Sequence, residues 1–130
     1  MRPMHGIERT IERFCDAWNR HDVDALAALW AEDGELNHPW GARSVGRAAV
    51  REALTGEHTG SMAESRLDVR SIDARGDDHT LTADIDGVLT AVRAPNGRTY
   101  DLDHRLTALF VRTGEEWQIR TMSPIANPRR

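Results

Sequence analysis

The feature that most restricts the fold of this chain is a change of hydrophobic periodicity near Met62. Before this residue, apolar side chains recur three and four positions apart, as they do along the buried face of a helix. After it, apolar and polar residues alternate, as they do in a strand with one buried face. Helices followed by strands predict an α+β domain, with the helices packed on one face of a curved, mainly antiparallel sheet.

The N-terminal half is predicted to form three helices, and the apolar side chains of each should face the core. The expected helices are Met4 to Arg20, Val23 to Trp30 with Asp22 as its cap, and a third from Ser44 or Gly46 to a stretch between Gly56 and Gly60. The Asp33-Gly34 pair is expected to end the second helix. Leu36 fits a brief strand before the next loop.

The C-terminal half is predicted to form a meander of four strands. They are centred on Leu67 to Ile72, Ala83 to Leu89, Leu102 to Phe110, and Trp117 to Ile119. Asn96-Gly97 is the strongest hairpin signal in the chain, because both residues tolerate the positive φ angles of a tight turn. A sheet bent around three helices forms a cone, and the open mouth of the cone is the natural pocket.

Length and charge exclude several classes of function. A chain of 130 residues is expected to form a single domain over residues 1–130. No apolar run approaches the roughly 18 residues of a membrane span, and the N-terminus does not resemble a secretory signal, so a cytoplasmic protein is expected. The net charge of −4 includes no strongly basic block, which argues against a nucleic-acid partner.

The loop His38-Pro39-Trp40-Gly41 is the first candidate site. Pro39 and Gly41 shape the backbone, and binding residues concentrate on loops that a rigid scaffold holds. An imidazole has a reference pKa of about 6.5, so His38 can accept and return a proton near neutral pH. The alternative is that His38 is a solvated loop residue and Trp40 only fills the core.

A second candidate lies at Asp103-His104 in the third predicted strand. Alternation with Leu102 and Leu106 sends His104 to the core side, where its ring needs a partner or a function. It is either a second acid/base group or a core or dimer-interface histidine. The same alternation sends Asp103 to the opposite face.

Tryptophans are frequent for so few aromatic residues, and they can line a pocket for a flat, hydrophobic ligand. The candidates are Trp18, Trp30 and Trp40; core filling is the alternative for Trp18 and Trp30. The six histidines show no metal-binding spacing, and no glycine-rich phosphate loop follows a strand. We therefore expect no metal and no cofactor.

The segments RFCDAWNRHDVDALAALWAEDGEL, GRAAV, NGR and LTALFVRTGEEWQI resemble the NTF2-like superfamily, which includes ketosteroid isomerases and SnoaL-type cyclases. The last segment is most similar to the SgcJ/EcaC family of natural-product clusters. The resemblance implies a cone-shaped α+β fold. It places His38 in the position of the proton-shuttling aspartate of the isomerases, and Phe14, as a ligand contact, in the position of their tyrosine.

The same resemblance would turn Asp103 into the pocket as a late-strand acid, against the alternation. It also implies a homodimer formed through the outer sheet face, where Val88, Leu109 and Val111 would otherwise be exposed. Three functions remain open at this point. They are a cofactor-free isomerase, cyclase or dehydratase acting on a polyketide-like intermediate, a noncatalytic binding protein for a hydrophobic ligand, and an oligomerisation module.

Overall fold

The computed structural model describes residues 6–39 and 41–125. Its first helix, α1 (Ile7–Arg20), begins after Gly6 and ends at His21, which adopts the left-handed conformation with φ 57°. Apolar side chains along one stripe of α1 are buried, as the periodicity predicts: Ile7, Ile11, Phe14, Ala17 and Trp18. The expected start at Met4 lies outside the described residues.

The second helix is shorter than predicted, because α2 (Val23–Ala27) ends before Trp30. The Asp22 side chain accepts a hydrogen bond from the Ala25 amide, which confirms the predicted cap. Trp30 instead begins strand β1 (Trp30–Asn37). A β-carbon on Gly34 would lie 2.8 Å from the Trp30 ring, so Gly34 permits a close approach inside a strand and does not end a helix.

A short strand, β2 (Arg43–Val45), pairs antiparallel with β1, and α3 (Arg47–Thr59) follows. Gly46 precedes the first turn of α3, and Gly60 follows its last residue, which confirms one of the two predicted starts and the predicted end. Ser44 lies in β2 opposite Leu36 and is not part of the helix. The strand expected at Leu36 is therefore one arm of a hairpin.

The four predicted C-terminal strands form the antiparallel meander β3 (Arg66–Gly76), β4 (Thr80–Arg93), β5 (Thr99–Thr113) and β6 (Glu116–Ile125). The Asn96-Gly97 turn joins β4 to β5, and Gly97 has a φ of 87°. With β1 and β2 the sheet has six strands in the order β2-β1-β6-β5-β4-β3. Among the strands of residues 6–39 and 41–125, only the β1–β6 pair is parallel, so the sheet is mainly antiparallel, as predicted.

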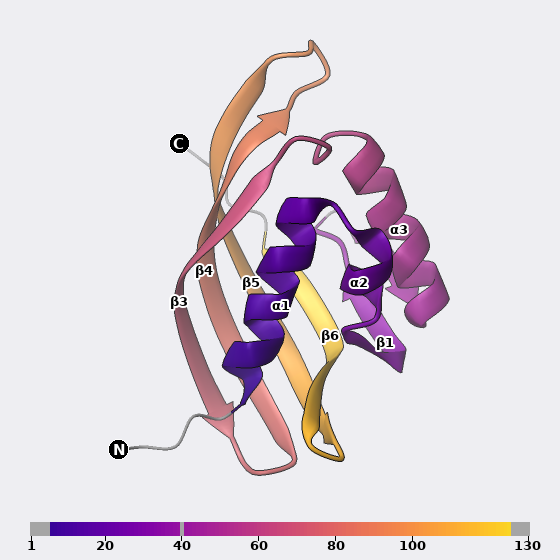
Figure 1. Cartoon of the computed structure of the whole chain (residues 1–130), viewed down its shortest axis with the longest axis vertical. Helices are drawn as coiled ribbons and strands as arrows, with labels where there is room; N and C mark the ends of the chain where they lie inside the picture. Colours follow the sequence, from indigo (N-terminus) through magenta and orange to yellow (C-terminus); the bar gives the residue numbers. More distant parts are fainter. Residues whose placement is uncertain (1–5, 40, 126–130) are drawn as a thin grey trace.

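The three helices lie on one side of the curved sheet, and α1 runs across its concave face (Figure 1). Alternate residues of β4 and β5 face this side and are buried, including Leu81, Ala83, Ala108 and Phe110. The core therefore lies between α1 and the sheet, and the predicted α+β cone is confirmed. The β4–β5 hairpin extends beyond the helices in the same view.

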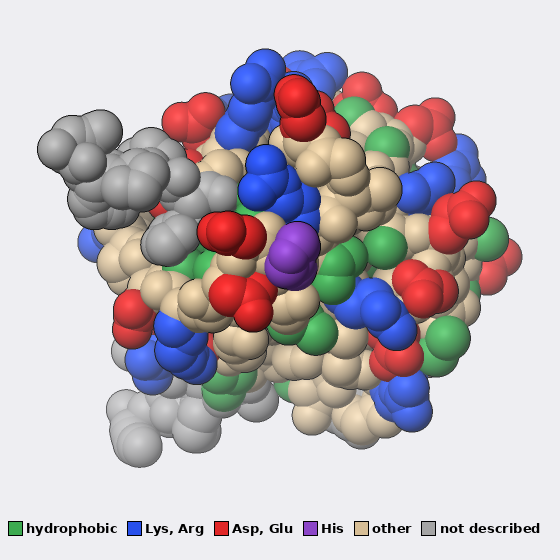
Figure 2. Space-filling model, turned by 90° about the horizontal axis from the view of Figure 1, so that it is seen from below, with side chains coloured by type: hydrophobic (Ala, Val, Ile, Leu, Met, Phe, Trp, Pro, Cys, Tyr) green, Lys and Arg blue, Asp and Glu red, His purple; other side chains and the backbone are tan. Residues whose placement is uncertain are grey.

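The opposite face of the sheet carries ion pairs between neighbouring strands. Arg105 pairs with Asp86 at 2.8 Å and Arg75 with Asp84 at 3.2 Å. Figure 2 shows the end of the molecule that lies at the bottom of Figure 1, where side chains of both charge signs are interspersed and hydrophobic atoms form small separate patches. That view therefore shows neither a basic stripe nor a large apolar surface.

Candidate functional site

A cavity of about 200 Å³ opens between the helices and the inner face of the sheet. Its wall is mostly apolar and comes from α1, α3 and the strands β1, β4, β5 and β6. The apolar lining residues include Phe14, Trp18, Trp30, Leu36, Leu54, Met62, Leu89, Leu102, Leu106 and Met122. Exposed Pro39 and Ile125 also border the cavity, so its open end lies beside the His38 loop.

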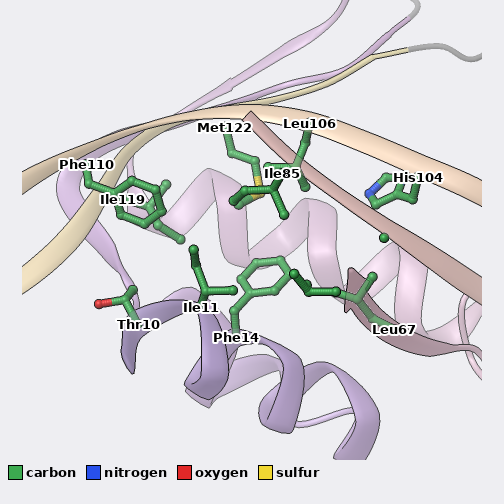
Figure 3. Close-up of a pocket in the computed structure, with 12 residues that line it drawn as sticks. Thr10, Ile11, Phe14, Leu67, Ile85, His104, Leu106, Phe110, Ile119 and Met122 are labelled. Carbon is green, nitrogen blue, oxygen red and sulfur yellow. The ribbon is translucent and has the colours of Figure 1, made fainter. Parts of the chain in front are cut away.

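A second, smaller chamber of about 20 Å³ adjoins this cavity under α1. Figure 3 shows Phe14 and Ile11 of α1 pointing up toward Ile85, Leu106 and Met122 of the sheet. The two chambers share four wall residues, namely Phe14, His104, Leu106 and Met122. These four side chains therefore form the boundary between the two chambers.

His104 is half-buried in β5 and points to the inner face, as the alternation predicts (Figure 3). It pairs with Gly87 of β4, where a β-carbon would lie 2.7 Å from the Asp68 carbonyl oxygen, so the glycine permits a close approach of β3. Burial lowers the pKa of His104 from its usual value, so the ring is neutral at neutral pH. Among residues 6–39 and 41–125, no hydrogen bond or ion pair engages this ring.

His38 lines the same cavity from the end of β1. Its amide donates to the Ala42 carbonyl at 2.8 Å, which closes the loop, and its ring Nε2 lies 3.2 Å from Ser44 Oγ. The two candidate histidines, far apart in the sequence, therefore line one cavity. His38 lies at the exposed end, and His104 lies at the boundary with the inner chamber.

Asp103 is exposed, and its position touches both faces of β5. It contributes to the cavity edge and also to a shallow depression on the outer face, where Arg70, Asp86 and Arg105 lie. The alternation predicted the outer face for Asp103 and the resemblance predicted the pocket, and Asp103 contributes to both. Of the acidic residues at this cavity, Asp103 is the more exposed to solvent.

The aromatic candidates divide by position. Phe14, Trp18 and Trp30 line the cavity together, with the Phe14 ring 5.9 Å from that of Trp18 and 6.0 Å from that of Trp30. Trp18 Nε1 donates to Ser65 Oγ at 2.9 Å, and Trp30 Nε1 donates to the Glu35 carbonyl at 3.1 Å. Their polar atoms are satisfied elsewhere, so each presents hydrocarbon to the cavity. Trp40 lies outside the described residues.

Glu57 is a cavity residue that the sequence reasoning missed. It is half-buried in the last turn of α3, and burial raises its pKa to about 7. Val50, Leu54 and Glu57 follow one another at helical spacing, so the apolar stripe of this helix ends in a carboxyl group. An acidic residue in register with a buried stripe was the available signal.

A pair of histidines beside the cavity was also not predicted from the sequence. His21 Nδ1 and His58 Nδ1 are 2.9 Å apart, so one ring donates a hydrogen bond to the other. Burial and the neighbouring His21 lower the pKa of His58 to about 4. The His58 ring also packs edge-on against Trp18, with centroids 4.4 Å apart. This pair supports the tryptophan wall from behind.

Over 6–39 and 41–125, no three His, Cys, Asp or Glu side chains come together as a metal site would require. Within the same ranges, the helices are too short and too polar to cross a bilayer.

The cone of three helices on a curved sheet is the NTF2-like fold, and its mostly apolar cavity carries a few ionisable groups. The model of the SnoaL-like domain family matches residues 11–122 of this chain, and the chain therefore belongs to that family. None of the curated proteins compared with it matches.

Solved structures share the fold at low sequence identity. An uncharacterized protein with a cystatin-like fold from Caulobacter vibrioides is 23% identical over 95% of this chain and 89% of its own, with a TM-score of 0.83. An NTF2-like protein with a cystatin-like fold from Novosphingobium aromaticivorans is 24% identical, covering 92% and 79%, with a TM-score of 0.77. Aln2 from a Streptomyces species is 15% identical, covering 92% and 87%, with a TM-score of 0.79.

Proposed function

We propose that this protein is a cofactor-free enzyme that moves protons on a hydrophobic, polyketide-like molecule during isomerisation, cyclisation or dehydration. The observation that carries the proposal is His104, a neutral imidazole with no partner among the described residues, in the wall of an apolar cavity. A neutral imidazole in a site that excludes water is an effective general base.

The two histidines have different roles in this proposal. His104 removes a proton from a carbon atom of the ligand, and His38 contacts the ligand at the open end of the cavity. Phe14, Trp18 and Trp30 hold the ligand through apolar contacts. Asp103, at the cavity edge, is the candidate group for returning protons to solvent. The similarity of LTALFVRTGEEWQI to SgcJ/EcaC proteins supports placing the chain near that family.

The probe 5-nitrobenzisoxazole tests proton transfer without knowledge of the natural substrate. A base removes its ring C–H proton, the N–O bond breaks, and the product is a coloured cyanonitrophenolate. We expect the protein to accelerate this reaction above an equal concentration of free imidazole. A His38→Ala/His104→Gln double variant should lose the acceleration, whereas His79→Ala, in an exposed turn, should keep it. Equal rates in the double variant and the wild type would refute the catalytic proposal.

The second candidate is a binding protein for the same class of ligand. It is favoured by the apolar wall and by Phe14, which has no hydroxyl in the position where the isomerases carry a tyrosine. This candidate predicts that aromatic polyketides quench the fluorescence of Trp18 and Trp30 without being converted. Binding with no turnover of any ligand or probe would support it.

We also propose a homodimer through the outer face of the sheet, where Val88, Leu109 and Val111 are only half-buried. Light scattering at micromolar concentration should report twice the chain mass of 14.6 kDa. Leu109→Arg should yield the monomer, because a charge at the centre of a paired face is costly to desolvate. The exposed variant Arg98→Ala serves as a control. A wild-type protein of 14.6 kDa would contradict the dimer.

A further inference from the structure

Glu57 is an ionisable cavity residue with no assigned role. It extends from the last turn of α3 and lines the cavity beside Leu54 and Met62. Over residues 6–39 and 41–125, the Glu57 carboxyl group has neither a hydrogen bond nor an ion pair. Among the described lining residues, no arginine is present that would neutralise it.

Stability does not account for a carboxyl group in this place. The C-terminal end of a helix carries partial negative charge, so an acidic side chain there is unfavourable. Burial in an apolar wall is unfavourable as well, and it raises the pKa of Glu57 to about 7. A residue that destabilises the fold at a ligand cavity is a candidate for function.

The ionisable groups on the other walls are of a complementary kind. His104 on β5 and His38 at the end of β1 can accept protons, and Asp103 lies at the cavity edge. His58, the next residue of α3, contacts His21 and does not line the cavity. Among the described residues, Glu57 is therefore the cavity group that holds a transferable proton at neutral pH away from the exposed edge.

We propose that Glu57 is the proton donor of this cavity and that the ligand presents a carbonyl or hydroxyl oxygen to the α3 wall. The inference rests on the proposed function and deepens it by naming the polar group of the substrate. In enolisation, the C–H proton passes to an imidazole and the Glu57 proton passes to the carbonyl oxygen, giving the enol, an imidazolium and a carboxylate. When the imidazolium returns its proton to carbon and the enol O–H proton passes back to Glu57, both side chains regain their starting protonation states.

The assay compares 1-indanone with indane, two probes of similar shape that differ in the carbonyl oxygen. Calorimetry gives the preference for the ketone, defined as the ratio of the indane to the indanone dissociation constant, between pH 5.5 and 8.5. We expect this preference to fall by about fivefold as pH rises, the size of one neutral hydrogen bond. Imidazole groups can also change charge near this range, so the wild-type curve alone is insufficient.

Variants of Glu57 isolate the contribution of its carboxyl group to the pH dependence of the ketone preference. Glu57→Gln should retain some preference for the ketone but remove its dependence on pH, and Glu57→Leu should remove the preference. Glu52→Gln, at an exposed position of the same helix, should behave as the wild type does. Indane affinity in each variant reports whether the cavity is intact.

Three results would overturn the inference. They are a wild-type ketone preference that does not depend on pH, a dependence that survives in Glu57→Gln, and failure of both probes to bind the wild type. None of these measurements involves a reaction. If the protein passes this test but does not accelerate the reaction of 5-nitrobenzisoxazole, the proposed catalysis is refuted. Glu57 then remains a hydrogen-bond donor to bound ketones.

Discussion

His104→Gln is expected to lower the turnover of 5-nitrobenzisoxazole by about 10²–10⁴-fold, the usual contribution of a general base. Glutamine has a similar size and remains polar, so the cavity should keep its shape, and KM should change little. The affected quantity is kcat, because the imidazole acts on the proton only in the transition state.

The pH profile provides an independent check on the same residue. Because burial lowers the pKa of His104, the ring is already neutral at pH 7, and the rate should fall only below the usual histidine pKa of about 6.5. In His104→Ala, added imidazole should enter the vacated space and restore part of the rate. His38→Ala should reduce the rate less. If His104→Gln kept the wild-type kcat, His104 would not be the base, and another group would have to remove the proton.

The second large effect concerns stability, and Glu57→Gln should make the protein more stable at pH 8. The folded pKa of Glu57 is about 7, against a model value of 4.5. The unfolded chain therefore releases this proton at lower pH than the folded one, and the folded state loses stability as pH rises from 4.5 to about 7. At about 1.4 kcal/mol per pKa unit, the loss is on the order of 3 kcal/mol.

Urea denaturation at several pH values tests this expectation. The stability gain of Glu57→Gln should be close to zero at pH 4.5 and complete at pH 8. His58 provides the opposite case, since its folded pKa is about 4 against a model value of 6.5. Its folded state loses stability as pH falls from 6.5 to about 4, so His58→Asn should reduce that acid loss. If Glu57→Gln increased stability equally at pH 4.5 and pH 8, the result would contradict a raised pKa for Glu57 in the folded protein.

The sequence predicted the long elements well because their periodicities are sustained. Strands β4 and β5 each bury alternate residues over many positions, and α1 buries one stripe. The segment around Trp30 misled the prediction because α2 has only five residues, too few to separate a helical period from the start of a strand. The position of Trp30 is decided by pairing with Ile119, which lies far away in the chain.

The candidate site was only partly predictable for a related reason. His104 could be placed on the inner face from its own strand, and His38 from its loop. Glu57 was missed because helical register, and not residue type, carries it into the cavity. The His21–His58 contact joins the end of α1 to α3, and no local pattern reveals a contact between separate elements.

The parallel pairing of β1 with β6 also has a consequence for folding. Trp30 is aligned with Ile119, and Leu36 with Met122, so residues from the first third of the chain are held by residues near its end. Contacts of such long sequence separation slow folding, because a large loop must close before they form. During synthesis, β6 leaves the ribosome after the rest of the sheet. The His38 loop, at the end of β1, therefore reaches its place in the cavity that it shares with His104 only after β6 has been synthesised.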